Sequence, residues 1–510
     1  MAVGGGVKPT ASILTSRPYT VNPLKGNLVS SGFVLGGFAL LIIAILLGLI
    51  PYSTLLSAIL GIAAGLFGLL RVGKNTDALH PVRVFGAIWC LCLALVPLKL
   101  TTTITDWPLS VWSYVILALL SFIGGFWLTS RRVSNGQHLQ GEASESELPP
   151  SEMLEPRRAL RVALVCLTVG ISAFSYEYWL IGGIPVLAQK IDAARTIFFA
   201  TAGRWSHPEF DTLFYKIVGI LTTPCKYAVY LAIILLIQKN RKTRAQIVMA
   251  AAIIVCGALA LASQGGRSPV IDILIFSGIL FHYMRRRLTS KHLSILGLIL
   301  SLFISFAGYY RYLHGRQDAF HIEVERVSKL PRGPLGDSIV VGYQSLTSPL
   351  ETFARFTNDF PTMRPPSAGF LFYSFHRLLP RTNIEEYTYH LYYGSLTNTF
   401  LGEFYGDFGF LGIILGPFIL GMGYGYVYFR ALCFKSLYWL CMESVFVGIL
   451  IYFPYMNLFS QQLTWIFDLS ALAILIPLAK PGKKRQLLSL VRAPGTARPA
   501  ATLSRAHFHH

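Results

Sequence analysis

The sequence predicts an all-α polytopic membrane protein with about 12 transmembrane helices. Three observations lead to this fold class. Apolar residues make up 53% of the 510-residue chain, and the mean hydropathy is +0.54. Apolar runs of about 20 residues, the length that crosses a bilayer, recur along the chain. Lysine and arginine are distributed unevenly among the segments between these runs, as expected when alternate segments face opposite sides of a membrane.

The predicted spans form three groups. Residues 30–129 contain the first four, residues 159–309 contain the next five, and residues 407–480 contain the last three. Their predicted bounds are 30–50, 53–70, 83–100, 109–129, 159–179, 217–237, 246–262, 268–284, 291–309, 407–429, 434–456 and 463–480. Four-residue glycine spacings, at Gly61/Gly65 and Gly412/Gly416, are typical of close helix packing.

The segments outside the spans have different characters. Residues 1–29 are mostly polar and contain no cleavable signal pattern. Residues 130–158 are rich in Ser, Glu and Pro, which predicts a disordered cytoplasmic linker. The first external loop covers about 180–216. The large external loop, 310–406, is too short for a separate catalytic domain and fits a lid of one or two helices. A basic cytoplasmic tail, 481–510, ends the chain.

The charge distribution predicts the orientation of the chain. With both termini in the cytoplasm, the inner segments hold 28 of the 44 lysines and arginines. The net charge of +20 then lies mostly at the inner leaflet, where anionic lipids attract it. No folded soluble domain carries this charge, which excludes nucleic-acid binding. The seven cysteines lie in or beside spans and are interpreted as core residues, not as a disulfide framework or a metal site.

Two carboxylates mark the start of a long apolar helix in the segment GEFYGDFG. Glu403 and Asp407 are four residues apart, so a helix places them on one face. Either could act as a general base, or both could cap the positive end of a helix. His376 and His390 in the large loop are rival bases. The acids inside the predicted spans, at positions 272, 443 and 468, are expected to make internal hydrogen bonds rather than to carry protons.

Arginines predicted on the outer side form a candidate anion site. Arg267 lies in SQGGRSPV, a turn in which Gly265 and Gly266 allow a sharp bend before a helix N-terminus. The further candidates are Arg195, Arg311, Arg316, Arg377 and Arg381. Together they could bind a pyrophosphate, and singly they could contact lipid headgroups. The chain contains no P-loop, HExxH or CxxC motif, so nothing in it calls for a metal, a nucleotide or another cofactor.

Four motifs resemble the Wzy-type O-antigen and oligosaccharide repeat-unit polymerases of bacterial inner membranes. They are GGIP at 182–185, SQGGRSPV at 263–270, GFLFYSFHRLLPR at 369–381 and GSLTNTFLGEFYGDFGFLGII at 394–414. With the topology, the resemblance covers roughly residues 160–480. It implies a GT-C-like glycosyltransferase bundle with a periplasmic lid loop, embedded in the inner membrane. A loop motif of some members, an arginine and a later glycine with ten residues between them, does not occur in either external loop.

The resemblance also implies a metal-independent reaction. An acceptor hydroxyl on one lipid-linked repeat unit attacks the anomeric carbon of a glycan on undecaprenyl pyrophosphate, and the pyrophosphate departs. Arg267 and Arg311 would hold the departing pyrophosphate, with Arg195 and the lid arginines in support. The implied partners are undecaprenyl-pyrophosphate-linked oligosaccharides and the lipid bilayer, and the family also allows a polysaccharide chain-length regulator.

Three other functions compete with the polymerase. An O-antigen ligase uses the same donor, transfers to lipid A-core and relies on a loop histidine, but the ending EFYGDFG favours the polymerase. A lipid-linked oligosaccharide flippase should carry charges inside the bundle that are reachable from both sides, whereas most basic residues here sit at helix ends. A purely structural scaffold would leave the loop arginines without a role.

Overall fold

The chain divides into two compact units, Met1–Leu55 and Leu56–His510, and every contact described below lies within the second. The computed structural model describes residues 52–69, 77–136, 148–187, 213–239, 242–264, 268–285, 288, 292, 295, 302, 328–331, 333–363, 399–434, 436–455 and 464–481.

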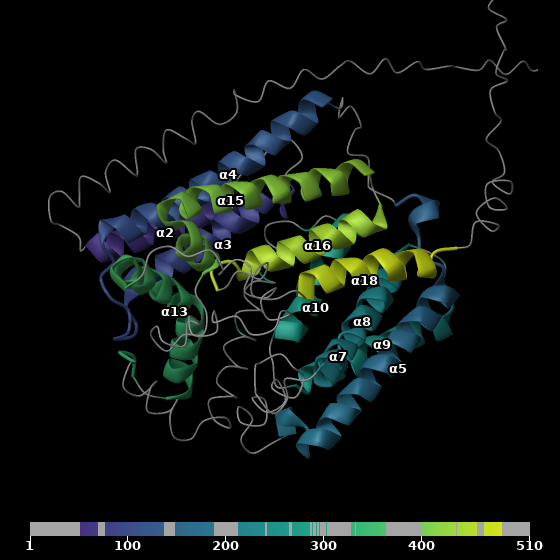
Figure 1. The fold of residues 1–510 in the computed structure, drawn as a ribbon. Helices are drawn as coiled ribbons and strands as arrows, with labels where there is room; N and C mark the ends of the chain where they lie inside the picture. The colour runs from purple at the N-terminus through teal and green to yellow at the C-terminus, as the bar shows by residue number, and fades with distance from the viewer. Residues whose placement is uncertain are drawn as a thin grey trace, which may run out of the picture. The chain divides into compact units, whose positions relative to one another are not determined.

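The helical elements of the described residues agree with the predicted all-α class (Figure 1). The helices are α2 (Tyr52–Leu69), α3 (Pro81–Leu95), α4 (Leu109–Gly136), α5 (Pro156–Ile181), α7 (Leu213–Leu221), α8 (Pro224–Ile237), α9 (Arg244–Ala262), α10 (Ser268–Met284), α13 (Pro334–Met363), α15 (Phe400–Phe434), α16 (Leu437–Tyr452) and α18 (Thr464–Ala479). Single-turn 3-10 helices are η1 (Val96–Leu98), η2 (Pro150–Glu152) and η3 (Pro185–Leu187).

Six helical stretches among the described residues are long and apolar enough to cross a membrane. They are Pro81–Leu98, Leu109–Arg132, Pro156–Ile181, Ile217–Ile237, Arg244–Ala262 and Phe400–Phe434. Shorter apolar helices cover Leu55–Phe67, Ser268–Met284, Leu437–Tyr452 and Trp465–Ala479. Ten of the 12 predicted spans therefore contain a described helix. The other two, 30–50 and 291–309, lie outside the described residues except at three isolated positions. The chain is a multi-pass helical membrane protein.

The predicted span 217–237 consists of two helices instead of one. α7 ends at Leu221, and α8 begins at Pro224. The hydroxyls of Thr222 and Thr223 donate to the carbonyls three residues earlier, each at 2.7 Å. Proline has no amide hydrogen to donate and is favoured in the first helical turn, so it starts a new helix here. The break places Lys226 in the first turn of α8, where a positive charge is unfavourable unless acids compensate it.

A bend at Gly409 divides α15, which corrects the predicted span 407–429. Gly409 has φ 57° and ψ −139°, a conformation that glycine adopts readily. Residues 400–408 form a separate helical segment that folds back onto the helix after the bend. A Cβ at Gly412 would overlap the carbonyl oxygen of Phe404, and one at Gly416 would overlap its ring. Residues 410–434 remain long enough to span, roughly 37 Å at 1.5 Å per residue.

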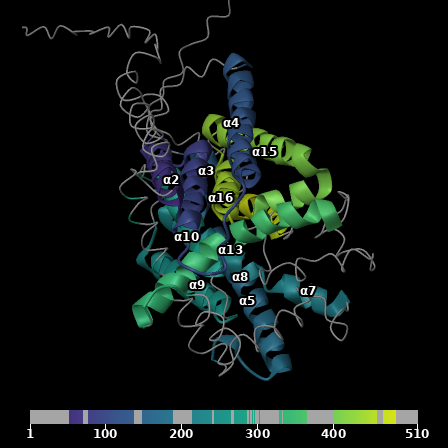
Figure 2. The same ribbon diagram turned by 90° about the vertical axis from the view of Figure 1, so that its left-hand side faces the viewer.

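Close backbone contact joins α4 to α15, which run side by side in Figures 1 and 2. A Cβ on Gly125 would overlap the carbonyl oxygen of Phe418, and one on Gly421 would overlap that of Phe122. Thr129 donates to the carbonyl of Met422 at 3.3 Å. Small residues spaced by four on both helices make this approach possible.

The two glycine pairs noted in the sequence, Gly61/Gly65 and Gly412/Gly416, are not part of the α4–α15 contact. Within the part of the chain that the structure describes, no atom lies within 4 Å of a Cβ built on Gly61 or Gly65, so the close packing expected there is not seen. Gly412 and Gly416 do pack closely, but against Phe404 of their own element.

An aromatic core holds α3, α4, α15 and α16 together. Phe400 stacks on Phe453 with ring centroids 4.6 Å apart, and Trp89 meets Phe400 edge-on at 5.3 Å. Phe85 contacts Phe122 at 4.3 Å. The indole of Trp89 donates to the carbonyl of Val115 at 3.1 Å, so its polar atom is satisfied inside the core. This core fixes the start of α15 beside the end of α16.

The ends of the predicted linker 130–158 are ordered, which corrects the prediction of disorder for them. α4 continues to Gly136, and η2 precedes α5. Glu152 accepts from the hydroxyl of Ser436 at 2.9 Å and from the amide of Leu437 at 3.0 Å, and so caps α16. The amide of Leu154 donates to the side chain of Gln238 at 3.1 Å. Residues 137–147 of the linker lie outside the described residues.

Candidate functional site

The buried polar residues of the described helices gather at two opposite ends of the bundle. At one end, which we call the α13 end, α3 and α16 finish, while α8, α10, α15 and α18 begin. At the opposite end, which we call the basic end, α3 and α16 begin and α8, α10, α15 and α18 finish. Described lysines and arginines at the basic end include Arg131, Arg132, Arg157, Arg158, Lys239, Lys242, Arg244, Arg285 and Lys480. The candidate site lies at the α13 end.

A lysine and two aspartates from three helices meet at the α13 end, and we call them, with Tyr452, the lysine–aspartate cluster. The ammonium of Lys226 (α8) lies 2.6 Å from Asp468 Oδ2 (α18) and 3.8 Å from Asp272 Oδ2 (α10). Tyr452, the last residue of α16, donates to Asp272 Oδ1 at 3.1 Å. The internal hydrogen bonds predicted for Asp272 and Asp468 are thereby confirmed.

The energetics of the cluster depend on its pairing. Taking a charged group out of water is costly unless an opposite charge and hydrogen bonds compensate it. The side chains of Lys226 and Asp468 are 16% and 7% exposed, so these two charges depend on each other. The ammonium also lies 5.5 Å from the ring centroid of Tyr230. A single lysine within the predicted apolar span 217–237 was the sequence signal of a buried acidic partner.

Two sequence motifs meet next to this cluster. The amide of Val186, just after GGIP, donates to the carbonyl of Ser263, the first residue of SQGGRSPV, at 3.1 Å. The hydroxyls of Tyr178 and Ser263 also hydrogen-bond. Gly182 ends α5 with φ 74°, which turns the chain toward this contact. The end of α5 and the end of α9 are therefore held together immediately before α10, which carries Asp272.

The carboxylates Glu403 and Asp407 lie on residues 400–408 of α15, before the bend. The segment is helical, so the predicted placement four residues apart on one helix face is confirmed. Both side chains are enclosed, with Glu403 1% and Asp407 7% exposed. Tyr405 between them donates to the carbonyl of Thr357 in α13 at 3.3 Å. In this arrangement the two acids lie in the protein interior.

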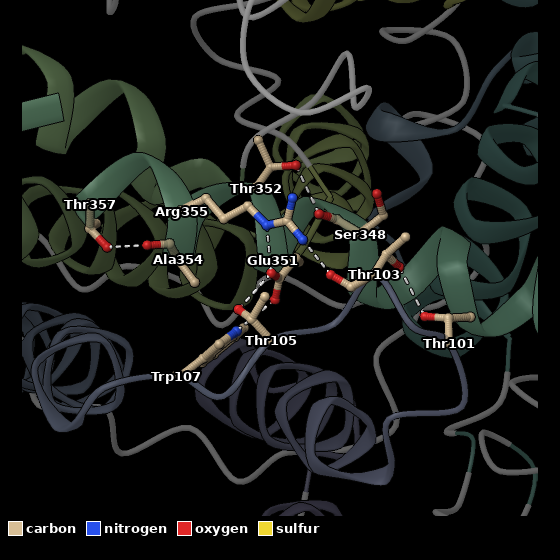
Figure 3. A network of polar contacts seen from close by, with 10 residues as sticks. All are labelled: Thr101, Thr103, Thr105, Trp107, Ser348, Glu351, Thr352, Ala354, Arg355 and Thr357. Atoms are coloured by element: carbon tan, nitrogen blue, oxygen red, sulfur yellow. Dashed lines mark hydrogen bonds and ion pairs between the residues drawn. The ribbon is translucent and has the colours of Figure 1, made fainter. Parts of the chain in front are cut away.

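Helix α13 lies in the large predicted loop and is anchored to the connection between α3 and α4 (Figure 3). Glu351 accepts from Thr105 at 2.8 Å, from the indole of Trp107 at 2.9 Å and from Arg355 Nε at 2.7 Å. Arg355 Nη2 donates to the carbonyl of Thr103. The side chain of Glu351 is 6% exposed, so these donors satisfy a buried carboxylate. The network fixes α13 to residues 103–107, the connection between α3 and α4.

Contacts lead without a break from α13 to the lysine–aspartate cluster. Tyr405 ties α13 to the first segment of α15. The amide of Phe400 at the start of that segment donates to the carbonyl of Phe453 at 2.9 Å. Phe453 follows Tyr452, which donates to Asp272. Helix α13, the α15 acids and the buried charges thus belong to one contiguous region.

Seven of the nine predicted site residues lie outside the described residues. They are His376, Arg195, Arg267, Arg311, Arg316, Arg377 and Arg381. The rival base His390 lies outside them too. The described residues that flank Arg267 are Gln264, which is 2% exposed, and Ser268, the first residue of α10.

A second polar cluster lies at the basic end. Asp77 accepts from His282 Nε2 at 2.8 Å, from Tyr428 at 3.0 Å and from Tyr283 at 3.2 Å. The amide of Leu288 donates to His282 Nδ1 at 2.9 Å, so Nε2 carries the proton. Burial favours a higher pKa for Asp77, but the hydrogen bonds from His282 and Tyr428 outweigh it and lower the pKa. These bonds fix the residues before α3 to α10 and α15, a structural role.

The acid at position 443 departs from its prediction. Glu443 in α16 is 0% exposed, and neither of its carboxylate oxygens has a hydrogen-bond partner among the described residues, contrary to the expected internal hydrogen bond.

The described residues contain no group of three or more His, Cys, Asp or Glu side chains placed to hold a metal ion. The seven cysteines are free thiols, and Cys90, Cys92, Cys225 and Cys441 are buried among core residues, as interpreted from the sequence.

Comparisons with known proteins give no relative for this chain. No protein-family model, no curated protein and no solved structure matches it.

Proposed function

We propose that this protein is a polysaccharide polymerase that joins undecaprenyl-pyrophosphate-linked oligosaccharide repeat units at the periplasmic face of the bacterial inner membrane. Its bundle would have about 12 spans and a GT-C-like arrangement, with both termini in the cytoplasm. The observation that carries the proposal is the contact between GGIP and SQGGRSPV, through Val186 and Ser263, at the end of the bundle that holds the lysine–aspartate cluster.

The proposed reaction uses positive charge and one proton acceptor. The acceptor hydroxyl attacks the anomeric carbon of the donor glycan, a new glycosidic bond forms, and the bond to the pyrophosphate breaks with its electron pair leaving on phosphate oxygen. Negative charge grows on the pyrophosphate in the transition state, so arginines held ready for it speed the reaction. Arg267 at the start of α10 and Arg311 are the proposed partners of this leaving group, supported by Arg195, Arg316, Arg377 and Arg381.

The enclosed positions of Glu403 and Asp407 support a different role for these two residues. Tyr405 joins their segment to α13, so the acids stabilise the junction between the lid and the bundle rather than contact the sugar. A ligase that transfers to lipid A-core remains an alternative, because its loop histidine would be His376 or His390.

One observation favours a second class of function, a flippase for lipid-linked oligosaccharides. A flippase needs charges inside the bundle, and the pair Lys226–Asp468 provides buried charges on helices α8 and α18. Buried charges in transporters line the substrate path. The two clusters of the present bundle lie at opposite ends, however, with the apolar stretches of the helices between them.

The test is reconstitution of the purified protein in liposomes with undecaprenyl-pyrophosphate-linked repeat units from the source organism. Products are separated on a gel and detected through the sugar. A polymerase gives a ladder spaced by one repeat unit without any added metal. Transfer only after addition of lipid A-core indicates the ligase. Movement of the lipid-linked units between leaflets without any new glycosidic bond refutes the proposal and indicates the flippase.

A further inference from the structure

The lysine–aspartate cluster contains one more acid than its lysine can pair closely. Asp468 is held by Lys226 at 2.6 Å and is 7% exposed. Asp272 Oδ2 is 3.8 Å from the same ammonium, beyond hydrogen-bonding distance. Tyr452 donates to the other oxygen of Asp272, and no described residue donates a hydrogen bond to Oδ2. One carboxylate oxygen at the α13 end is therefore open to a further donor.

Exposure separates Asp272 from the other bundle acids at this end. Its side chain is 32% exposed, whereas Glu403 is 1% and Asp407 is 7% exposed. Glu351, on the lid helix, is 6% exposed and already accepts from Thr105, Trp107 and Arg355. A group that takes a proton from a ligand must come within hydrogen-bonding reach of it. Asp272 is the most exposed of these four acids and is therefore the best placed to contact a ligand.

The position of Asp272 in α10 relates it to the proposed leaving-group site. It is the fifth residue of α10, little more than one turn after Ser268 and five residues after Arg267. A pyrophosphate bound at the start of α10, as the proposed function requires, would lie about one helical turn from this residue.

We propose, resting on the function proposed above, that Asp272 is the general base of the glycosyl transfer and that Tyr452 and the Lys226–Asp468 pair position it. As the acceptor oxygen bonds to the anomeric carbon, its proton passes to Asp272 Oδ2. The bond between that carbon and the pyrophosphate breaks, and its electron pair leaves with the pyrophosphate. Tyr452 holds Oδ1 so that Oδ2 faces the hydroxyl. Lys226 stays bound to Asp468 throughout and balances one of the two negative charges.

The central variant is Asp272→Asn, whose amide oxygen still accepts from Tyr452 but cannot take up a proton. We expect the rate of repeat-unit transfer at saturating substrate to fall by about 10²- to 10⁴-fold, the usual contribution of a general base. The KM for the lipid-linked repeat unit should stay within about threefold of the wild-type value, because the substitution removes the proton acceptor and leaves binding of the substrate nearly unchanged. Asp106→Asn is the matched control, since Asp106 is a strongly exposed acid at the same end, and its rate should equal that of the wild type.

Two further measurements distinguish a base from a merely structural residue. Added formate should restore transfer by Asp272→Ala in a concentration-dependent way, because a small carboxylate can occupy the vacated space, and should do nothing for Asp468→Ala. Tyr452→Phe should lower the maximal rate by about tenfold with an unchanged KM, as expected for a residue that only orients the base. If Asp272→Asn fails to fold, formate rescue of Asp272→Ala and the maximal rate of Tyr452→Phe test the role of Asp272 instead.

The outcomes separate this inference from the proposed function. A wild-type protein that makes no ladder refutes both. A wild-type ladder together with full activity of Asp272→Asn overturns the role of Asp272 alone. The same conclusion follows if Glu403→Gln or Asp407→Asn loses the maximal rate with unchanged stability while Asp272→Asn keeps it.

Discussion

Removal of the charge of Lys226 tests whether the buried pair stabilises the bundle. Lys226→Met keeps most of the side-chain length but leaves Asp468, 7% exposed, without its partner at 2.6 Å. Breaking one partner of a buried ion pair costs about 3–5 kcal/mol, because the remaining charge stays out of water. The partly exposed Asp272 contributes little to this loss, since its contact with Lys226 is longer, at 3.8 Å. We therefore expect a loss near that range in the free energy of unfolding.

The assay is unfolding by SDS in mixed micelles, followed by intrinsic fluorescence. Lys99→Met is the matched control, because Lys99 pairs with a strongly exposed Asp106 and such pairs contribute about 0–1 kcal/mol. The double variant Lys226→Met/Asp468→Leu removes both charges and should recover most of the lost stability. If Lys226→Met is as stable as Lys99→Met, or if the double variant is no better than Lys226→Met, the buried-pair argument fails.

Two further predictions concern other contacts. Gly421→Leu should disrupt the α4–α15 contact, because a Cβ at this position would overlap the carbonyl of Phe122, and should lower the yield of folded protein in size-exclusion chromatography. Gly423→Leu is the matched control, since no described atom lies within 4 Å of a Cβ built there, and it should not lower that yield. Burial favours a higher pKa for Glu152, but hydrogen bonds from Lys480, Leu437 and Ser436 outweigh it and lower the pKa. Its stabilising effect is therefore full above the usual glutamate value of 4.5 and is lost as the pH falls further, and Glu152→Gln should show a flatter fall of thermal stability with acid than the wild type.

The number and position of most helices followed from the sequence because apolar length is a local property. Ten predicted spans contain helices, since a run of apolar residues near 20 in length has few alternatives in a membrane. The bend at Gly409 was not predicted, because the apolar pattern continues through it and only the backbone angles reveal it. Glycine spacing alone does not say which helix surface faces a partner: Gly412 and Gly416 pack against Phe404 of their own element, and no described residue packs against Gly61 or Gly65.

The candidate site was predicted only in part, because it depends on contacts between distant segments. Lys226 and Asp468 are 242 positions apart, and no local pattern links them. Glu403 and Asp407 were recognised as unusual acids, but their burial comes from the fold-back of α15 onto itself and from Tyr405 against α13. Sequence reasoning identified residues that membranes tolerate poorly, and the packing decides which of them a ligand can reach.

The bend of α15 at Gly409 has a mechanical consequence for the way α13 is attached to the bundle. Gly409 has a positive φ, so residues 400–408 turn back along the helix that follows. Phe404 of this segment packs against Gly412 and Gly416, and Phe400 stacks on Phe453 at the end of α16. A load applied to α13 enters the segment through Tyr405 and is spread over these contacts. The folded-back segment therefore acts as a brace between α13 and the membrane-spanning helices.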